Sequence, residues 1–174
     1  MIELRISPFE PGKCISSSPI TFYHLYKDGK IVDRTLYTKY GYLGDKYKGI
    51  LVLSKRTIEE IKPSILDSCR KGNRKYPKYT MHENIVVVSG ETGQIIFDTK
   101  ESYCFDGAPC VISDYMFIYK NILYDNKGSI IKKFSSYIET IENNNVFIVK
   151  DGTRFSKDAD IYIFSKKGRL LIEY

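Results

Sequence analysis

The 174-residue sequence contains no tryptophan, only two histidines and only four cysteines. Closely spaced cysteine pairs, which structural zinc sites require, are missing among Cys14, Cys69, Cys104 and Cys110. We therefore predict no metal site and no other cofactor, and we expect the cysteines to be reduced, partly buried thiols.

Long hydrophobic runs are missing too. Glu3 and Arg5 interrupt the first apolar residues, and the longest apolar run is Tyr115–Tyr119. A transmembrane helix needs about 20 consecutive apolar residues, and a secretory signal needs an uninterrupted hydrophobic core. We therefore expect a cytoplasmic protein that is neither exported nor bound to a membrane.

Enzyme signatures are equally scarce. Gly41, Gly44 and Gly49 lack the Lys-Ser or Lys-Thr ending of a phosphate-binding loop. His24 and His82 are the natural candidates for a general acid and a general base, but they would have to converge in one pocket. His24 fits a partly buried position inside a strand, so we assign no catalytic residue and predict that the protein is not an enzyme.

Charge is present in quantity but is unevenly distributed. Residues 1–83 carry 16 Lys and Arg against 9 Asp and Glu, a balance of +7, whereas residues 84–174 carry 11 against 12, a balance of −1. Any electrostatic preference for a partner therefore belongs to the first half of the chain.

A self-similar unit occurs four times. Each copy has apolar residues, a short polar turn with a glycine, and then two consecutive apolar residues, which is typical of a β-hairpin. The copies are Phe22–Tyr37 around Gly29, Ile85–Thr99 around Gly93, Ile122–Phe134 around Gly128, and Ile161–Tyr174 around Gly168. The sequence therefore predicts a mainly β protein with repeated antiparallel hairpins, which are clearest in residues 84–174.

We expect residues 1–174 to form one domain with an insertion at about 55–83. Alternation predicts a strand at Ile2–Ile6, and a short strand is expected at Ile50–Leu53. In Thr57–Lys71 the apolar residues lie on one helical face, which predicts a short helix whose main part begins near Pro63 or Ser64. A basic loop follows this helix.

Three of the hairpins resemble the outer hairpins of β-propeller blades of the WD-repeat type. The resemblance rests on Ser89–Ile96, with its Glu-Thr-Gly turn, on Ile122–Ile131 and on Ile161–Leu171. It implies four-stranded antiparallel sheets in an open or half propeller, because the chain holds about four blades at that spacing. The Trp-Asp and Gly-His signatures of the family are missing, so its hydrogen-bonded tetrad is not carried over. A β-sandwich or barrel is the alternative.

The segment 70–79 interleaves five positive charges with two tyrosines. Arginine forks to carboxylate or phosphate, and tyrosine anchors interfaces or stacks on bases, so the segment fits an acidic protein or a nucleic acid. A solvated loop is the third interpretation. The candidate partner-binding residues are Arg70, Lys71, Arg74, Lys75, Tyr76, Lys78, Tyr79 and His82.

A small β-rich protein of this composition resembles the immunity or inhibitor partners of bacterial toxins, some of which are similar to half propellers. The resemblance implies that the chain neutralises a toxin by covering its active site, with the basic half facing an acidic surface. The alternative is an RNA-binding or RNA-processing protein that uses the segment 70–79. The sequence predicts no oligomeric state.

Overall fold

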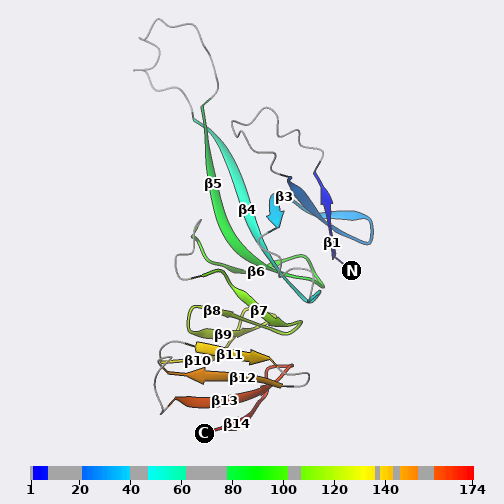
Figure 1. Cartoon of the computed structure of the whole chain (residues 1–174). Helices are drawn as coiled ribbons and strands as arrows, with labels where there is room; N and C mark the ends of the chain where they lie inside the picture. Colours follow the sequence, from blue (N-terminus) through cyan, green and yellow to red (C-terminus); the bar gives the residue numbers. More distant parts are fainter. Residues whose placement is uncertain are drawn as a thin grey trace, which may run out of the picture.

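The computed structural model describes residues 2–7, 21–39, 47–61, 78–101, 107–135, 138–142, 146–152 and 159–174. Within these residues the chain forms fourteen strands and no helix, which confirms the mainly β fold class (Figure 1). The strands are β1 (Ile2–Ile6), β2 (Tyr23–Lys27), β3 (Lys30–Lys39), β4 (Ile50–Ile61), β5 (Lys78–Ser89), β6 (Ile95–Asp98), β7 (Cys110–Ser113), β8 (Met116–Tyr119), β9 (Ile122–Asp125), β10 (Ile130–Lys133), β11 (Ile138–Glu142), β12 (Val146–Asp151), β13 (Asp160–Ser165) and β14 (Leu170–Glu173).

These strands form three antiparallel sheets, each in chain order. The first sheet has six strands in the order β1-β2-β3-β4-β5-β6, and the second and third have the orders β10-β9-β8-β7 and β11-β12-β13-β14. Each strand pairs with its neighbour in sequence, so each connection within a sheet reverses the chain. In the described residues none of the sheets closes on itself.

The first sheet bends over on itself around a buried apolar cluster. Ile2 and Leu25, from its first two strands, share this cluster with Val86 and Val88 of β5. A Cβ placed on Gly93, in the turn before β6, would lie 3.0 Å from Ile2 Cδ1. The two ends of the bent sheet therefore approach each other.

The opposite face of β4 and β5 packs on the second sheet. Side chains alternate between the two faces of a strand, so Ile50 and Val52 point away from the first cluster. They share a second cluster with residues of the second sheet. Aromatic rings fill its centre, where Phe117 and Tyr124 stack with centroids 5.0 Å apart and Phe97 lies 4.9 Å from Tyr124.

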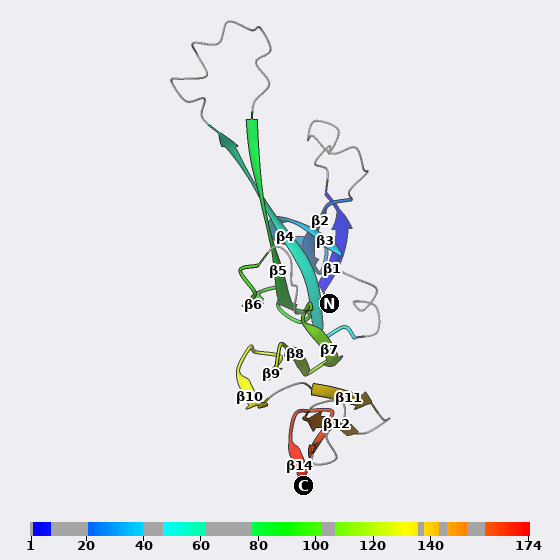
Figure 2. The same cartoon turned by 60° about the vertical axis from the view of Figure 1, so that its left-hand side comes forward.

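The other face of the second sheet packs on the third sheet. The members of this third cluster are Ile112, Met116, Ile118, Leu123, Phe134, Phe147, Val149, Tyr162 and Phe164. The second sheet is thus covered on both faces, between the first and third sheets (Figures 1 and 2). Among the described residues, the third sheet has a packing partner on one face only.

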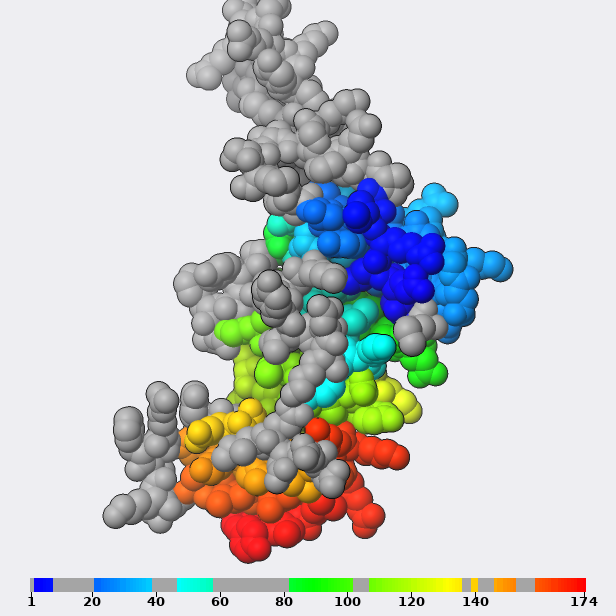
Figure 3. Space-filling model, turned by 45° about the vertical axis from the view of Figure 1, so that its right-hand side comes forward, coloured from blue at the N-terminus to red at the C-terminus, as the bar shows by residue number. Residues whose placement is uncertain are grey.

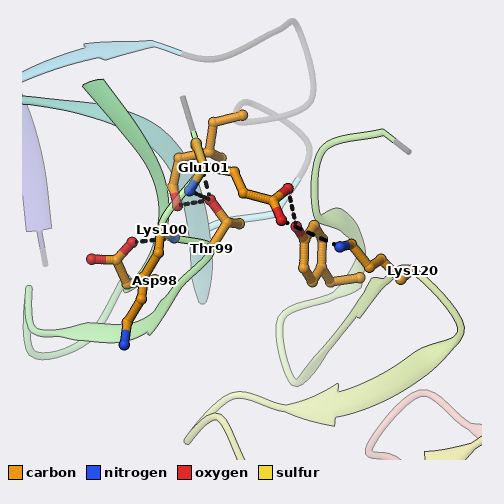
Figure 4. A network of polar contacts seen from close by, with 7 residues as sticks. Asp98, Thr99, Lys100, Glu101 and Lys120 are labelled. Carbon is orange, nitrogen blue, oxygen red and sulfur yellow. Dashed lines mark hydrogen bonds and ion pairs between the residues drawn. The ribbon is translucent and has the colours of Figure 1, made fainter. Parts of the chain in front are cut away.

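A polar network joins the end of β6 to the second sheet (Figure 4). Thr99 Oγ1 donates a hydrogen bond to Ile85 O at 2.9 Å and holds the chain beside β5. Glu101 then accepts hydrogen bonds from Tyr119 Oη at 3.0 Å and Lys120 Nζ at 3.3 Å. The last described residue of this segment is therefore fixed to β8 and to the turn that follows β8.

Polar contacts also join the second sheet to the third. Ser113 Oγ donates to Lys166 O at 2.7 Å, and Lys132 Nζ donates to Glu173 Oε1 at 3.1 Å. Lys132 Nζ lies 3.8 Å from the centroid of the Tyr162 ring. Burial lowers the pKa of Lys132, but the contacts with Glu173 and Tyr162 raise this pKa above its ordinary value on balance. The charged form of Lys132 thus helps to hold the two sheets together.

The four predicted hairpins are confirmed, and they share a bulge as well as a glycine. Their turn glycines have φ angles of 77° to 88°, in the left-handed region that glycine adopts without strain. In all four the pairing register skips one residue just after the turn, which is a β-bulge. The skipped residues are Val32, Ile96, Ile131 and Leu171, which are the second members of the four predicted apolar pairs.

Consecutive hairpins meet through this bulge. The last three of the four turn glycines each lie so close to the bulged residue of the preceding hairpin that a Cβ on the glycine would overlap or crowd it. The pairs are Gly93 with Val32, Gly128 with Ile96, and Gly168 with Ile131. We call this the glycine–bulge contact. It sets the spacing between hairpins because only a residue without a side chain permits so close an approach.

The helix predicted from Thr57 is wrong at its start. Thr57–Ile61 belongs to β4, and β4 is twelve residues long rather than the short strand expected at Ile50–Leu53. Thr57, Ile58 and Ile61 are β-branched residues that suit a strand, and each pairs with a residue of β5. The rest of the predicted helix, residues 62–71, lies outside the described residues.

A buried tyrosine of β3 belongs to the first cluster. Tyr37 is fully buried, and its hydroxyl donates to Asp33 Oδ2 at 2.7 Å. Burial, together with this carboxylate, raises the pKa of Tyr37 well above its ordinary value. Burial also raises the pKa of Asp33, but hydrogen bonds from Thr35 and Tyr37 outweigh it and lower the pKa overall. The Asp33 carboxylate is therefore more stable in the folded chain than in the unfolded chain.

We expect Gly128→Ala to destabilise the protein more than Gly29→Ala. Both glycines have a positive φ, so alanine strains the backbone by about 1–2 kcal/mol at either position. At Gly128 the new Cβ also overlaps the backbone oxygen of Ile96, whereas at Gly29 it meets nothing within 4 Å. Thermal unfolding should give a total loss of about 2–5 kcal/mol for Gly128→Ala. Equal losses in the two variants would contradict the glycine–bulge contact.

Asp33 should make stability depend on pH in the acid range. Because its pKa is lowered on folding, its contribution is present above the ordinary value of 3.8 and is lost as the pH falls through the lowered value. Urea unfolding should show the wild type more stable than Asp33→Asn at pH 7 and the difference shrinking below about pH 4. A difference that stayed constant down to about pH 2 would show that the Asp33 charge is not stabilised by folding.

Candidate protein-binding surface

A two-stranded ribbon projects from the first sheet. β4 and β5 pair along twelve residues, from Ile50↔Ser89 to Ile61↔Lys78. β3 pairs with β4 only as far as Arg56, and β6 reaches only Val86 on β5. Beyond these points the two strands pair only with each other, and the ribbon extends away from the three sheets (Figures 1 and 2).

The ribbon is fixed at its base by a partly buried ion pair. Arg56 Nη2 lies 2.9 Å from Glu83 Oε2, directly across the two strands, and Arg56 Nε donates to the same carboxylate at 3.1 Å. Ser54 Oγ donates to the other oxygen of Glu83. The side chains of Arg56 and Glu83 are 12% and 28% exposed, so water screens this pair only partly.

Aromatic packing completes the base. The Arg56 guanidinium lies 5.6 Å from the centroid of the buried Phe22 ring, within the range of a cation–π contact. Arg56 Nη1 is buried and has no hydrogen-bond partner among the described residues. An isolated two-stranded ribbon is marginally stable in water, so the contacts at this base stabilise the pairing of β4 with β5 beyond Arg56.

The predicted partner-binding residues belong to β5 or to the sequence that connects β4 with β5. Arg70, Lys71, Arg74, Lys75 and Tyr76 lie outside the described residues. The Ile61↔Lys78 pair fixes both ends of the segment 62–77 that contains them. Lys78 and Tyr79 belong to β5 and not to a loop, and they pair with Ile61 and Glu60.

His82 also belongs to β5 and not to the edge of a loop. It is exposed and pairs with Thr57. His24 is half-buried on β2, as predicted, and its Nε2 lies 2.8 Å from Ser7 Oγ. By alternation, His82 shares a face of the sheet with Val86 of the first cluster, whereas His24 is on the opposite face from Leu25 of that cluster. The sheet separates the two imidazoles, so they do not form one site.

Sequence reasoning missed a second candidate surface, the open face of the third sheet. Ile148, Ile163 and Ile172 form a row across three strands on the face opposite the third cluster. Leu171 and Ile172 are 48% and 41% exposed. The signal was available, because Val146–Val149 is apolar at consecutive positions and such a strand is typically covered on both faces.

Comparison of the chain with protein-family models, with curated proteins and with solved structures finds no match in any of the three. In the part of the chain that the structure describes, no three His, Cys, Asp or Glu side chains are grouped to hold a metal ion. No helix in that part is long and apolar enough to cross a membrane. The functional argument therefore rests on the sequence and on the geometry of the described residues.

Removing Glu83 should destabilise the base of the ribbon. Glu83→Ala leaves the guanidinium of Arg56 and the hydroxyl of Ser54 without their acceptor in a partly buried place, so we expect a loss of about 1.5–3 kcal/mol. The matched control is Glu3→Ala, because Glu3 and its partner Arg5 are about half exposed. The control should change stability by less than about 0.5 kcal/mol in urea unfolding. Similar losses in both variants would show that the Arg56 pair is no more than a surface contact.

Proposed function

We propose that the protein is a protein-binding module, and more specifically an immunity or inhibitor protein that covers the active site of a bacterial toxin. The observation that carries this proposal is the projecting ribbon. Its last described pair, Ile61↔Lys78, lies away from the three sheets, and the basic tyrosine-containing segment connects these two strands in the sequence. A ribbon that projects in this way is able to enter a concave surface such as an active-site cleft.

The ribbon and the composition of its segment support each other. The anchored base of Arg56, Glu83 and Phe22 reduces the ordering that the ribbon must undergo when a partner binds. Tyrosine and arginine are the residue types that most often dominate binding energy at interfaces. The positive balance of residues 1–83 favours an acidic partner surface and raises the association rate through electrostatic steering.

The sheets supply the platform. We propose that the four glycine-centred hairpins belong to blade-like units of an open, half β-propeller. Support comes from the chain-order sheets, from their face-to-face packing and from the glycine–bulge contact between consecutive hairpins. The sheets of the stack pack on one another, so the stack holds the ribbon before any partner binds.

An RNA-binding protein is the second candidate. The interleaving of Arg74, Lys75, Tyr76, Lys78 and Tyr79 favours it, because such a segment can neutralise phosphates and stack on unpaired bases. Salt separates the two candidates. The affinity of a nucleic-acid complex falls steeply as salt rises, whereas a protein interface anchored by buried aromatic contacts weakens much less.

The test uses the chain as bait in a pull-down from its native cells, with and without nuclease. We expect one stoichiometric protein that survives nuclease treatment and moderate salt. Arg74→Glu/Lys75→Glu should slow association with that purified protein by about tenfold and leave the melting temperature of the chain unchanged. Lys127→Glu/Lys133→Glu is the matched control, since both lysines are exposed on the second sheet away from the ribbon.

The captured protein should then inhibit growth when it is produced alone and should be neutralised when the chain is produced with it. Loss of the captured material on nuclease treatment would instead support RNA binding. A captured protein that binds both charge-reversed variants equally well would contradict a role for the ribbon. A large fall in melting temperature in Arg74→Glu/Lys75→Glu would show that these residues are structural.

A further inference from the structure

The glycine–bulge contact occurs three times inside the chain. One turn glycine and one bulged residue take no part in it, and we call these the two free halves. Three hairpins place a turn glycine on the bulged residue of the preceding hairpin. The hairpin β2–β3 has a free glycine side, because a Cβ on Gly29 would meet nothing within 4 Å. The hairpin β13–β14 has a free bulge side, because Leu171 is not among the nearest neighbours of any described turn glycine.

Both hairpins with a free half keep the two features of the joined hairpins, a turn glycine with a positive φ and a bulged residue three positions after it, although the β2–β3 turn is tighter because Lys27 pairs directly with Lys30. Gly29 has a φ of 77°, within a degree of the 78° of Gly93. Leu171 is skipped by the strand pairing in the same way as Ile131, whose side chain packs against Gly168. The apolar residue beside each free half is also exposed: Ile31 is 42% exposed and Ile172 is 41% exposed.

The free halves lie at opposite ends of the stack of sheets. β2 and β3 form the outer part of the bent first sheet, and β14 belongs to the third sheet on the far side of the second (Figures 1 and 3). They are therefore too far apart to meet within one molecule. A contact between them requires two molecules.

We propose that the open face of the third sheet binds the β2–β3 hairpin of a second copy of this chain, with Gly29 of one copy on Leu171 of the other. Such a contact is head-to-tail, so it can close into a ring or continue as a filament. Two copies would bring six sheets into one ring, which is within the range of about four to eight blades in closed propellers. This inference does not depend on the function proposed for the ribbon.

Charge at the turns predicts how the contact responds to salt. The turn Lys27–Lys30 has two lysines and one aspartate, and the turn Ser165–Arg169 has two lysines and one arginine. Both turns are positive and would lie side by side, so they repel each other. Screening of this repulsion should strengthen self-association as salt rises. Binding of an acidic partner by the ribbon should respond to salt in the opposite direction.

The test is sedimentation of the full chain over about 1–100 μM, the concentration range in which a contact of micromolar affinity populates a dimer. We expect a concentration-dependent dimer whose fraction increases between about 0.05 and 0.5 M salt. Leu171→Glu should weaken association at least about tenfold, because it buries a charge in an apolar contact. Tyr115→Glu is the matched control, since Tyr115 is 44% exposed in the β7–β8 turn and is not part of any glycine–bulge contact.

Gly29→Asn blocks the other half. Asparagine tolerates a positive φ, so the hairpin should fold, but its side chain occupies the space that the neighbouring copy needs. Melting curves will show whether each variant is folded. The variants Leu171→Glu and Gly29→Asn should each be monomeric alone, and an equimolar mixture should give a 1:1 heterodimer because one intact contact is restored.

Three results would overturn the proposal. One is a wild-type chain that stays monomeric at about 100 μM in high salt. Another is a Gly29→Asn variant that dimerises as well as the wild type while Leu171→Glu does not, which would show that two third sheets pack on each other. The last is equal weakening by Leu171→Glu and Tyr115→Glu, which would show a nonspecific effect of the added charge.

Discussion

The close approach of each turn glycine to the bulged residue of the preceding hairpin is the constraint on which the stack of sheets depends. A small antiparallel sheet has two faces, and an apolar face needs a cover. The bulged residue brings its side chain, as with Val32 and Ile131, or its backbone oxygen, as with Ile96, against the next hairpin, and the glycine leaves room for it. Without that room Ile96 and Ile131 would hold the following hairpins too far away for the second and third clusters to close.

The ribbon extends beyond the part of the first sheet that is packed in the stack. Residues 50–53 of β4 and residues 85–88 of β5 are covered on both faces, by the bent part of the first sheet and by the second sheet. Beyond Arg56 and Glu83 these strands leave that cover. The Arg56–Glu83 pair lies where the two strands leave this cover. Its partial exposure limits the desolvation of the ions, and its paired geometry fixes the two strands.

The hairpins could be predicted from the sequence because they are local. Their signal is a glycine that must have a positive φ, flanked by apolar residues of adjacent strands. The pair of apolar residues after each turn was visible as a repeat, although its cause, one paired residue followed by one bulged residue, was not. The ribbon could not be predicted in the same way. The spacing of Ile58 and Ile61 fits a helix, and only pairing with Met81 and Lys78, about twenty residues away, makes them a strand.

The sequence by itself determined the β class, the four reversals with their glycines, the burial of His24 and the separation of a basic half from a neutral half. Only the tertiary structure decided that the sheets stack in chain order, that β4 and β5 continue as a ribbon, that His24 and His82 are on opposite faces, and that one face of the third sheet has no cover among the described residues. The reason is the separation along the sequence of the residues on which each feature depends. Turn conformation and alternation depend on adjacent residues, whereas strand pairing and face coverage depend on residues that meet only when the chain has folded.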